Sequence, residues 1–420
     1  MTVDHSRTVD HSRPVDHSRS VVRSRSQGYE VVRYRSLVRV LMLTREFPPA
    51  SIGGVAAHVD GLAGALARAG HEVVVFSVDN EGDLPARSVT VDGVRVMRAR
   101  TDLPWLPDDD EVLRTSSANN QMVALAADIV DGWRPDVVHA HDWHTAWAGD
   151  TLSTLFAVPL VATFHSTERG RHGGHVPEGA SSAINAVEAW LAYRSTAQIC
   201  CSRFMMRELL EGLDPANVQL VPNGVDPRVW EPSGAIAREP LVLAWGRVQY
   251  EKGFQVLAQA MALLRGRVPG IRCVIAGRGS YLPELQSQVD IEGVSDLVNL
   301  AGFVPDDELR SLLHRAGCVV IPSLYEPFGI VALESLAAGA PTVAARTGGL
   351  AEIIEGTDAA LLFEPGNARQ LAAAIERVLN ESALANDMQT KGREVLRSRF
   401  SWDAIATSTT AVYENVISGR

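Results

Sequence analysis

Glu326 and Glu334 stand eight residues apart, on either side of a Pro-Phe-Gly turn. Residues 318–323 form an apolar, β-branched run that predicts a buried strand, and residues 330–338 are good helix formers. Glu326 therefore lies just before a helix, and Glu334 about two turns into it. Two carboxylates placed in this way can accept hydrogen bonds from the hydroxyl groups of a bound molecule.

The start of this predicted helix is also an anion site. The N–H groups of Gly329, Ile330 and Val331 have no partner within a helix, and they point to the space above the preceding strand. The segment therefore suits a ligand that carries both phosphate and hydroxyl groups. Glutamates near a helix start also occur because they complement the helix dipole, and this explanation stays open for the segment taken alone.

Two further loops follow predicted strands and suit a diphosphate. Gly53 and Gly54 open a helix after the first strand, and a glycine pair lets backbone N–H groups approach phosphate closely. Arg247 and Lys252 follow the first strand of the second half and offer two cations. A tight turn and solvated surface charge are the structural alternatives. The Gly-x-Gly-x-x-Gly spacing of a dinucleotide site is absent.

Histidines gather in two loops of the first half. The stretch His-Ala-His-Asp-Trp-His at 139–144 suggests metal ligands, but its spacing differs from the His-x-His-x-Asp-His pattern of metal-dependent hydrolases. We therefore expect no metal, and we interpret Asp142 with the following tryptophan as a site for sugar hydroxyls and a pyranose face, with core or capping roles as the structural alternative. His165 follows the next strand, where local hydrogen bonding is the structural alternative. The Arg-Gly-Arg-His run at 169–172 suits an acceptor or a phosphate.

Apolar strands alternate with amphipathic helices from residue 37 onward, which predicts an α/β protein with two doubly wound, Rossmann-like domains. Strands that are apolar throughout are typical of parallel sheets covered on both faces. The predicted strands are 38–43, 72–78, 136–140, 159–164, 198–202 and 219–222, then 241–246, 271–276, 299–303, 318–322, 341–345 and 361–363. Ligands of such sheets bind beyond the carboxyl ends of the strands, where the residues above fall.

The predicted parts of the chain are a disordered, repeat-bearing tail at 1–36, an N-terminal domain at 37–225, a linker at 226–239, a C-terminal domain at 240–400, and a helix at 401–420 that crosses back to the N-terminal domain. The tail contains Val-Asp-His-Ser-Arg three times and carries a net charge of +3, against −14 for the remainder. It has no apolar stretch of a secretory signal and little to bury. A start codon placed too early, or attraction to an anionic polymer or membrane, are the alternatives for it.

The bulk composition excludes several classes of protein. Hydrophobic residues make up 46 % and charged residues 21 % of the 420 positions, as in ordinary globular proteins. The net charge of −11 argues against a nucleic-acid binder, and no run of about 20 apolar residues could span a membrane. The four cysteines show no metal-ligand spacing, so we expect buried thiols, a reducing cytoplasm, and at most peripheral membrane contact.

Together these motifs resemble the retaining GT-B glycosyltransferases of family 4, the group that contains glycogen synthases and many bacterial sugar transferases. The resemblance rests on Glu-x7-Glu with its internal Pro-Phe-Gly, the glycine pair, the His-Asp-Trp-His stretch, and Gly-Arg-x4-Lys-Gly, and it covers roughly residues 38–418. It implies two facing domains around a cleft, an ADP-, UDP- or GDP-sugar as donor, a glycan acceptor, and no cofactor or metal. It leans towards α-glucosyl transfer, as in actinobacterial α-1,4-glucosyltransferases.

The resemblance also implies a role for each residue. His165, Glu326 and Asp142 would hold the reacting sugar as catalytic residues, and Glu334 would bind the ribose. The donor diphosphate would be bound by Gly53, Gly54, Arg247, Lys252, Gly329, Ile330 and Val331, and the sugar also by Phe328 and Gly329. Transfer would retain the anomeric configuration, with the departing phosphate as the base.

Three alternatives stay open. The same fold could transfer a mannosyl or N-acetylglucosaminyl group to an inositol or lipid acceptor. It could also be a nucleotide-sugar 2-epimerase, which needs no acceptor, or a non-catalytic carbohydrate-binding protein.

Overall fold

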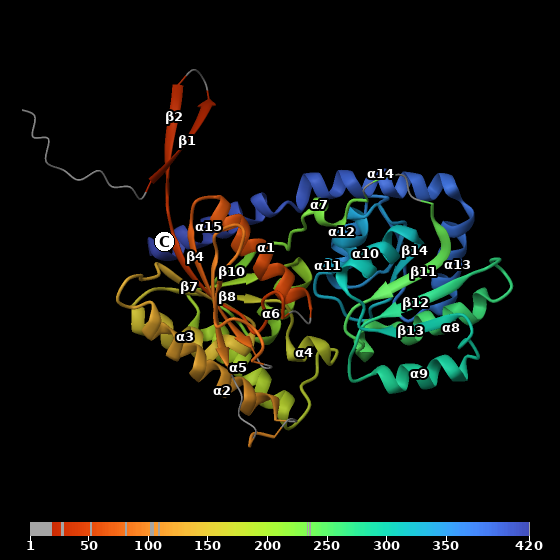
Figure 1. Ribbon diagram of the computed structural model, residues 1–420, viewed down its shortest axis with the longest axis horizontal. Helices are drawn as coiled ribbons and strands as arrows, with labels where there is room; N and C mark the ends of the chain where they lie inside the picture. Colours follow the sequence, from red (N-terminus) through yellow and green to blue (C-terminus); the bar gives the residue numbers. More distant parts are fainter. Residues whose placement is uncertain are drawn as a thin grey trace, which may run out of the picture.

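The computed structural model describes residues 19–26, 29–50, 53–79, 82–100, 105–107, 110–232, 234 and 237–419. Figure 1 shows two lobes side by side, the N-terminal lobe in red to green and the C-terminal lobe in green to blue. Each lobe is built on one mainly parallel sheet with helices packed around it (Figure 1). The prediction of an α/β protein with two Rossmann-like domains is therefore confirmed.

The N-terminal sheet has eight strands in the order β10-β9-β8-β7-β3-β4-β6-β5. They are β3 (Arg39–Leu43), β4 (Glu72–Asp79), β5 (Arg87–Val89), β6 (Arg95–Arg100), β7 (Val137–His141), β8 (Leu160–Phe164), β9 (Ala197–Cys200) and β10 (Val218–Leu220). Neighbours run parallel, except that the edge strand β5 is antiparallel to β6. The loops after β3, β7 and β8 therefore open on one edge of the sheet.

The C-terminal sheet has six strands, all parallel, in the order β13-β12-β11-β14-β15-β16. They are β11 (Glu239–Trp245), β12 (Arg272–Ala276), β13 (Val298–Gly302), β14 (Ala316–Ile321), β15 (Thr342–Ala345) and β16 (Leu361–Phe363). The central strands β11 and β14 are almost wholly buried, as their continuous apolar sequences require. The loops after these two strands carry the basic and acidic residues that the sequence singled out.

Helices cover both sheets. In the first half they are α1 (Gly54–Arg68), α2 (Glu111–Ala124), α3 (Ala146–Phe156), α4 (Glu168–Arg171), α5 (Ala180–Arg194), α6 (Arg203–Gly212) and α7 (Pro227–Trp230). In the second half they are α8 (Phe254–Leu264), α9 (Leu282–Ile291), α10 (Asp306–Arg315), α11 (Ile330–Ala337), α12 (Gly348–Ile354), α13 (Ala368–Asn380), α14 (Ser382–Arg399) and α15 (Trp402–Ile417). Short 3₁₀ turns are η1 (Leu125–Asp128), η2 (Trp143–Thr145) and η3 (Tyr250–Lys252).

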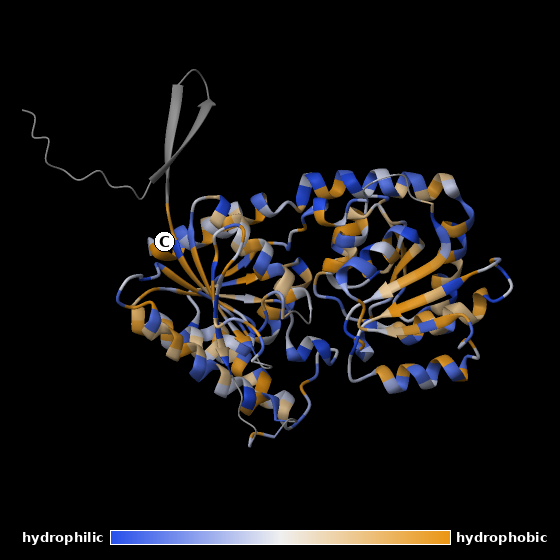
Figure 2. Cartoon of the chain, in the orientation of Figure 1, coloured by the Kyte–Doolittle hydropathy of each residue, from blue (hydrophilic) through white to orange (hydrophobic). Residues whose placement is uncertain are grey.

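Figure 2 shows mostly hydrophobic strands, whereas α14 carries many hydrophilic residues. Among the described helices, none has the length and apolarity needed to cross a membrane.

The last helix belongs spatially to the N-terminal lobe. Figure 1 shows α14 running along the C-terminal lobe and α15 continuing over the N-terminal one. There α15 packs on α1, and the Tyr413 hydroxyl lies 2.7 Å from Nδ1 of the buried His139. The Trp402 ring fills a notch between Gly61 of α1 and Gly224, where a Cβ at either glycine would collide with the indole. The absence of side chains at these two positions is therefore what lets α15 pack so closely.

A second set of contacts joins the start of α6, in the N-terminal lobe, to the C-terminal lobe. The side chain of Ser202, which caps α6, donates a hydrogen bond of 2.6 Å to the Pro327 carbonyl oxygen in the C-terminal lobe. The Glu352 carboxylate accepts from the backbone N–H groups of Arg203 and Phe204 at 2.9 and 2.7 Å. A carboxylate at a helix start complements the positive end of the helix dipole. The start of α6 is thus fastened directly to the turn that contains Glu326.

The N-terminal segment differs from its prediction. β1 (Arg19–Ser26) and β2 (Tyr29–Ser36) form an antiparallel hairpin, whereas the sequence predicted disorder over 1–36. Each strand contains a Val-Val pair, and β-branched residues favour the extended backbone. Pairing two such segments satisfies their backbone hydrogen bonds without a large core. Residues 1–18, 27 and 28, which hold most of the repeated pentapeptides, lie outside the described residues.

All the strands predicted from residue 37 onward are present, but β5 and β6 were not predicted. In β6, the sequence Arg-Val-Met-Arg-Ala-Arg interrupts the apolar run with arginines. The structure accommodates the buried Arg98 because its guanidinium donates to the Ser88 hydroxyl at 2.8 Å and to the Pro48 carbonyl oxygen at 3.0 Å. These acceptors come from other segments, so nothing within the strand's own sequence indicates them.

The notch for Trp402 makes a prediction about stability. Gly61→Ala should destabilise the protein by about 1–3 kcal/mol, because the new methyl group overpacks the contact with the indole. In a Trp402→Ala background the same change should instead stabilise by about 0.5–1 kcal/mol, since alanine is the better helix former. Urea unfolding of the four proteins measures both effects. An unchanged sign in the two backgrounds would contradict this packing.

Candidate active site

Two helix starts from opposite lobes meet at the centre of the molecule. Gly53 and Gly54 begin α1 of the N-terminal lobe, and Ile330 begins α11 of the C-terminal lobe. A Cβ at Gly54 would lie 3.1 Å from Cδ1 of Ile330, and one at Gly53 would lie 4.0 Å from Cδ of Arg247. The unpaired N–H groups of both helix starts and the guanidinium of Arg247 thus converge on one small region.

Lys252 and Glu326 form an ion pair on the C-terminal side of this region. Nζ of Lys252 lies 2.8 Å from Oε2 of Glu326, which also accepts a hydrogen bond of 3.1 Å from the Ser323 hydroxyl. The loop that carries Lys252 is fixed because the Leu324 N–H donates to the Glu251 carbonyl oxygen at 2.8 Å. Gly253 has a φ of 71°, and a Cβ there would collide with the Pro322 carbonyl oxygen. The two charged residues are therefore brought together by close backbone packing.

Glu334 lies in α11 and has a partner on β11. Its Oε2 accepts a hydrogen bond of 3.3 Å from the indole N–H of Trp245. The sequence placed Glu334 about two turns into the helix; because α11 begins only at Ile330, it lies little more than one turn in. Burial raises the pKa of Glu334 to about 7, although the Trp245 N–H acts in the opposite direction. The carboxyl group can therefore change its charge near neutral pH.

The turn between these two glutamates has a special backbone. Gly329 has a φ of 101°, and a Cβ there would lie 2.5 Å from Cδ2 of Leu350. Glycine is needed at this position for both reasons. Phe328, one of the two residues predicted to bind the sugar, is buried, with its ring centroid 6.0 Å from that of Phe400. The buried ring anchors this part of the turn in the core.

Asp142 and His165 face this region from the N-terminal lobe. Asp142 has a φ of 58°, an uncommon value for a residue with a side chain, and its Oδ1 accepts a 2.7 Å hydrogen bond from the backbone N–H of His165. This bond ties the loop after β7 to the loop after β8. Burial raises the pKa of Asp142, while the charges of His144, Arg171 and Arg247 and the His165 N–H lower it.

His165 is half-buried and packs against the fully buried His58 and His141. Its Nε2 lies 3.2 Å from Nδ1 of His141, and its ring packs edge-on against His58 at 4.6 Å between centroids. Burial lowers the pKa of His165 to about 4, so its ring is uncharged at neutral pH. Sequence reasoning missed His58. The available signal was a single polar residue within the apolar face of the helix that the glycine pair opens.

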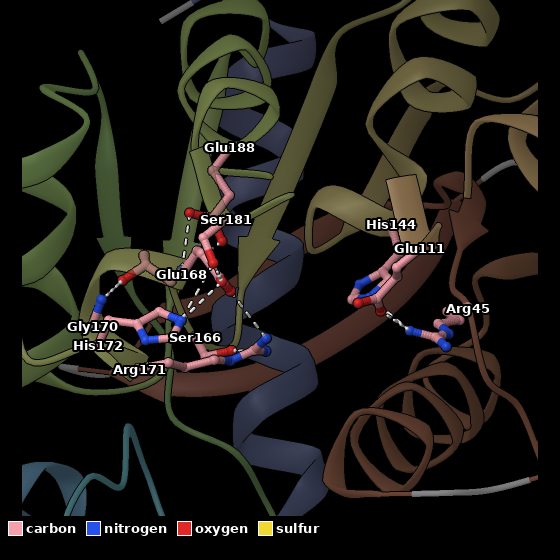
Figure 3. A network of polar contacts seen from close by, with 11 residues as sticks. Arg45, Glu111, His144, Ser166, Glu168, Gly170, Arg171, His172, Ser181 and Glu188 are labelled. Atoms are coloured by element: carbon pink, nitrogen blue, oxygen red, sulfur yellow. Dashed lines mark hydrogen bonds and ion pairs between the residues drawn. The ribbon is translucent and has the colours of Figure 1, made fainter. Parts of the chain in front are cut away.

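A second polar network of the N-terminal lobe consists of Arg45, Glu111 and His144. Figure 3 shows Arg45, Glu111 and His144 in contact, with Nη1 of Arg45 2.8 Å from Oε1 of Glu111 and 2.9 Å from Nε2 of His144. A hydrogen bond with His144, and then the charge of Arg45, lower the pKa of Glu111 to about 2. The predicted His-Asp-Trp-His stretch is thus split: His144 faces this network, whereas Asp142 faces His165.

The basic loop at 169–172 is held by two glutamates. Figure 3 shows Glu168 in contact with Arg171, His172 and Ser181. The backbone N–H of Glu168 donates to the buried carboxyl group of Glu188 at 2.9 Å. Burial is the main cause that raises the pKa of Glu188 to about 8. The backbone at the start of this segment is therefore held by the Glu188 carboxyl group, which stays largely protonated at neutral pH.

The structure brings most of the predicted site residues into one interlobe region. His165 and Asp142 lie on its N-terminal side, Glu326, Lys252 and the start of α11 on its C-terminal side, and Gly53, Gly54 and Arg247 where the two meet. The arrangement offers hydrogen-bond donors and positive charge for phosphate, and uncharged or acidic groups for hydroxyls. Such a site can stabilise negative charge that develops on a leaving diphosphate.

Comparisons with known proteins agree with this geometry. The model of Glycosyltransferase Family 4 matches residues 52–229, and that of glycosyl transferases group 1 matches residues 229–395. A glycogen synthase from Mycobacterium tuberculosis (strain H37Rv) is 38 % identical over 393 residues, covering 90 % of this chain and 94 % of its own. An alpha-maltose-1-phosphate synthase from the same organism is 30 % identical over 412 residues, covering 90 % and 100 %. The structure of sucrose-phosphate synthase from Thermosynechococcus elongatus superposes with a TM-score of 0.79 at 25 % identity, covering 91 % and 100 %.

The fold and the site define a two-domain enzyme that transfers sugars. This chain belongs to the family 4 glycosyltransferases of the GT-B fold. The predictions of the fold, of the family and of glycosyltransferase activity are confirmed. The roles of individual residues and the identities of donor and acceptor remain predictions.

The protonated Glu188 makes a prediction about pH. The native state holds this proton up to a pKa of about 8, whereas the unfolded chain releases it near 4.5. Between these values the native state binds more protons, so this group's contribution to stability falls as pH rises. Glu188→Gln should reduce the fall in unfolding free energy between about pH 5 and pH 8, by on the order of 1–3 kcal/mol. Urea unfolding at several pH values measures it. The exposed Glu178→Gln is the control, and equal slopes in all three proteins would contradict the assignment.

Proposed function

We propose that this enzyme transfers an α-glucosyl group, with retention, from a nucleotide-diphosphate glucose to a glucan or related glycan. The observation that carries the proposal is the meeting of two anion-binding helix starts from opposite lobes, at Gly54 and Ile330, beside Arg247 and Lys252. The similarity to a glycogen synthase over nine-tenths of the chain supports glucose as the sugar and a glucan as the acceptor.

In this proposal the donor diphosphate lies between the two lobes. The N–H groups at the starts of α1 and α11 and the guanidinium of Arg247 bind its oxygens. Lys252 already pairs with Glu326 at 2.8 Å, so it can serve the phosphate while remaining next to the carboxylate. These donors are in place before the reaction, so they stabilise the charge of the leaving diphosphate without reorganisation.

The sugar of the donor lies against the other residues of the cleft. Glu326 and Asp142 accept hydrogen bonds from its hydroxyl groups. His165 is uncharged at neutral pH and half-buried, and its Nε2 is engaged by His141. In the proposal its Nδ1, for which no hydrogen bond to the described residues is seen, binds a hydroxyl group of the sugar. A neutral ring binds a hydroxyl without adding positive charge next to an oxocarbenium-like centre.

Retention follows from attack on the face from which the diphosphate leaves. The bond between the anomeric carbon and the phosphate oxygen breaks, and the acceptor oxygen bonds to the same face. The acceptor's proton passes to the departing phosphate oxygen. The proposal includes no metal and no cofactor, because the helix starts, Arg247 and Lys252 supply the compensating charge. We also place the enzyme in a reducing cytoplasm, where its four buried free thiols remain reduced.

A phosphorylated sugar is the second candidate acceptor. In this alternative, the basic run at 169–172, which lies in and just after α4 and contains Arg169, Arg171 and His172, binds the phosphate of the acceptor. The similarity to an alpha-maltose-1-phosphate synthase supports the same choice.

Purified enzyme should be incubated with ADP-, UDP- and GDP-sugars, with glycogen, with glucose 1-phosphate, with an inositol or lipid acceptor, and without acceptor. Polymer growth supports the proposal; a phosphorylated disaccharide supports the second candidate. An isomerised sugar without acceptor, or binding without turnover, would overturn both.

Two substitutions test the residues that hold the sugar. His165→Ala and Glu326→Ala should each lower kcat by about 10²–10³-fold, because each removes a preplaced hydrogen-bond partner of the reacting sugar. Their melting temperatures should stay within a few degrees of the parent enzyme, as expected when stability changes by about 1 kcal/mol or less in a chain of this size. Glu376→Gln, which alters an ion pair far from the cleft, is the matched control. Near-parental rates in both variants would contradict the site.

The pKa of Glu334 predicts a pH-dependent affinity for the donor. The ionised carboxylate can accept hydrogen bonds from two ribose hydroxyls, whereas the protonated form accepts fewer. Ionisation increases as pH rises through about 7, so affinity for a nucleotide sugar should increase over the same range. Nucleotide sugars suit the measurement because their diphosphate diester does not titrate there. Calorimetry from about pH 6 to 8 measures it, and Glu334→Gln should remove the dependence. An affinity that falls with pH would contradict the ribose assignment.

A further inference from the structure

Three histidines from three different elements meet in the N-terminal lobe, next to the proposed sugar site. His58 comes from α1, His141 from the end of β7, and His165 from the loop after β8. Each offers one ring nitrogen, and these three atoms lie within 4.8 Å of one another. Sequence spacing did not show this group, because its members are far apart in the chain and only His141 belongs to the motif at 139–144.

The distances are close to those of a metal site. Nδ1 of His141 and Nε2 of His165 are 3.2 Å apart. Two imidazole nitrogens bound to a tetrahedral zinc ion, at about 2.0–2.1 Å each, are about 3.3 Å apart. His58 must move by an ångström or so to complete the set. Its ring can turn at the cost of its interaction with the Asn223 side chain alone, because neither ring nitrogen has a well-formed hydrogen bond to the described residues.

The missing partners are themselves informative. His58 is buried to 2 % exposure, and neither of its ring nitrogens makes a well-formed hydrogen bond with the described residues, although the side chain of Asn223 lies beside it. The neighbouring His139 differs: its Nδ1 meets the Tyr413 hydroxyl and its Nε2 the Thr163 hydroxyl, each at 2.7 Å. Buried polar atoms normally have partners. The unsatisfied nitrogens of His58 therefore indicate a ligand, whereas His139, with both ring nitrogens bonded, is a structural residue.

We propose that His58, His141 and His165 bind one zinc ion, and that the bound ion inhibits glycosyl transfer. Neutral imidazole is the form that ligates metals, and zinc accepts three histidines with one open position. His165 is half-buried, whereas His58 and His141 are buried, so the ion reaches the site from the side of His165. The inhibition rests on the proposed role of His165 toward the sugar, whereas the binding of zinc does not.

Metal binding can be measured without any substrate. The full-length protein is treated with EDTA, desalted, and titrated with Co²⁺ as a visible probe, then with Zn²⁺. We expect visible absorption typical of tetrahedral cobalt, its loss on addition of zinc, and one zinc per chain after dialysis. His58→Phe keeps a buried ring but removes the ligand, and should weaken binding by at least about 100-fold, more than outer-shell changes cost. His141→Gln serves as a second variant should the first not fold.

An exposed histidine controls for adventitious binding. His172, which contacts Glu168 at 3.1 Å, could hold zinc on the surface, so His172→Ala should leave cobalt binding unchanged. Absence of stoichiometric binding would overturn the proposal. Binding that survives in both His58→Phe and His141→Gln, or that is lost in His172→Ala, would also overturn it.

Activity then tests the second half of the proposal. Zinc at one equivalent should inhibit transfer by the parent enzyme, EDTA should restore it, and His58→Phe should stay active in the same zinc concentration. Transfer that is unaffected by bound zinc would overturn the inhibition. Cobalt binding without transfer from any donor would support the site and sink the proposed function. Transfer without cobalt binding would support the proposed function and overturn the metal site.

Discussion

The attachment of α6 to the C-terminal lobe is the constraint on which the site depends. The Ser202 hydroxyl donates to the Pro327 carbonyl oxygen, and the Glu352 carboxylate caps the first N–H groups of α6. The Tyr325 hydroxyl adds a bond of 2.8 Å to Glu208 in the same helix. These bonds fasten one lobe to the very turn that carries Glu326 and the start of α11. Because these bonds fasten the turn to α6, the site residues of the two lobes keep fixed positions relative to one another.

Within that frame the two ends of the cleft differ in their electrostatics. Helix starts, Arg247 and Lys252 make one end positive, and Glu326 balances part of this charge through its ion pair with Lys252. The other end contains buried histidines whose pKa values burial holds below the ordinary range. A nucleotide sugar has the matching division, with its charge at the diphosphate and uncharged hydroxyls on the sugar. The division arises because charge is tolerated where solvent and counter-charges are near and is suppressed where packing excludes them.

Local sequence predicted the strands well where a run was apolar throughout, as in β4 or β14, because such runs have few alternatives to a central parallel strand. It failed at β6, where the buried Arg98 depends on acceptors from distant segments. It also gave no sign that the Phe328 ring packs on Phe400. In both cases the outcome was decided by a partner far along the chain, which a local pattern does not contain.

The sequence by itself determined the class of fold, the family, and the positions of the loops that carry Gly53, Arg247, Glu326 and His165, because periodicity and motif spacing are local properties of a chain. Only the tertiary structure decided that α1 and α11 begin against each other, that α15 returns to seat Trp402 between two glycines, and that His58 joins His141 and His165. These contacts join residues separated by tens to hundreds of positions. Their geometry follows from the packing of whole sheets and helices, which fixes distances that no spacing along the sequence can specify.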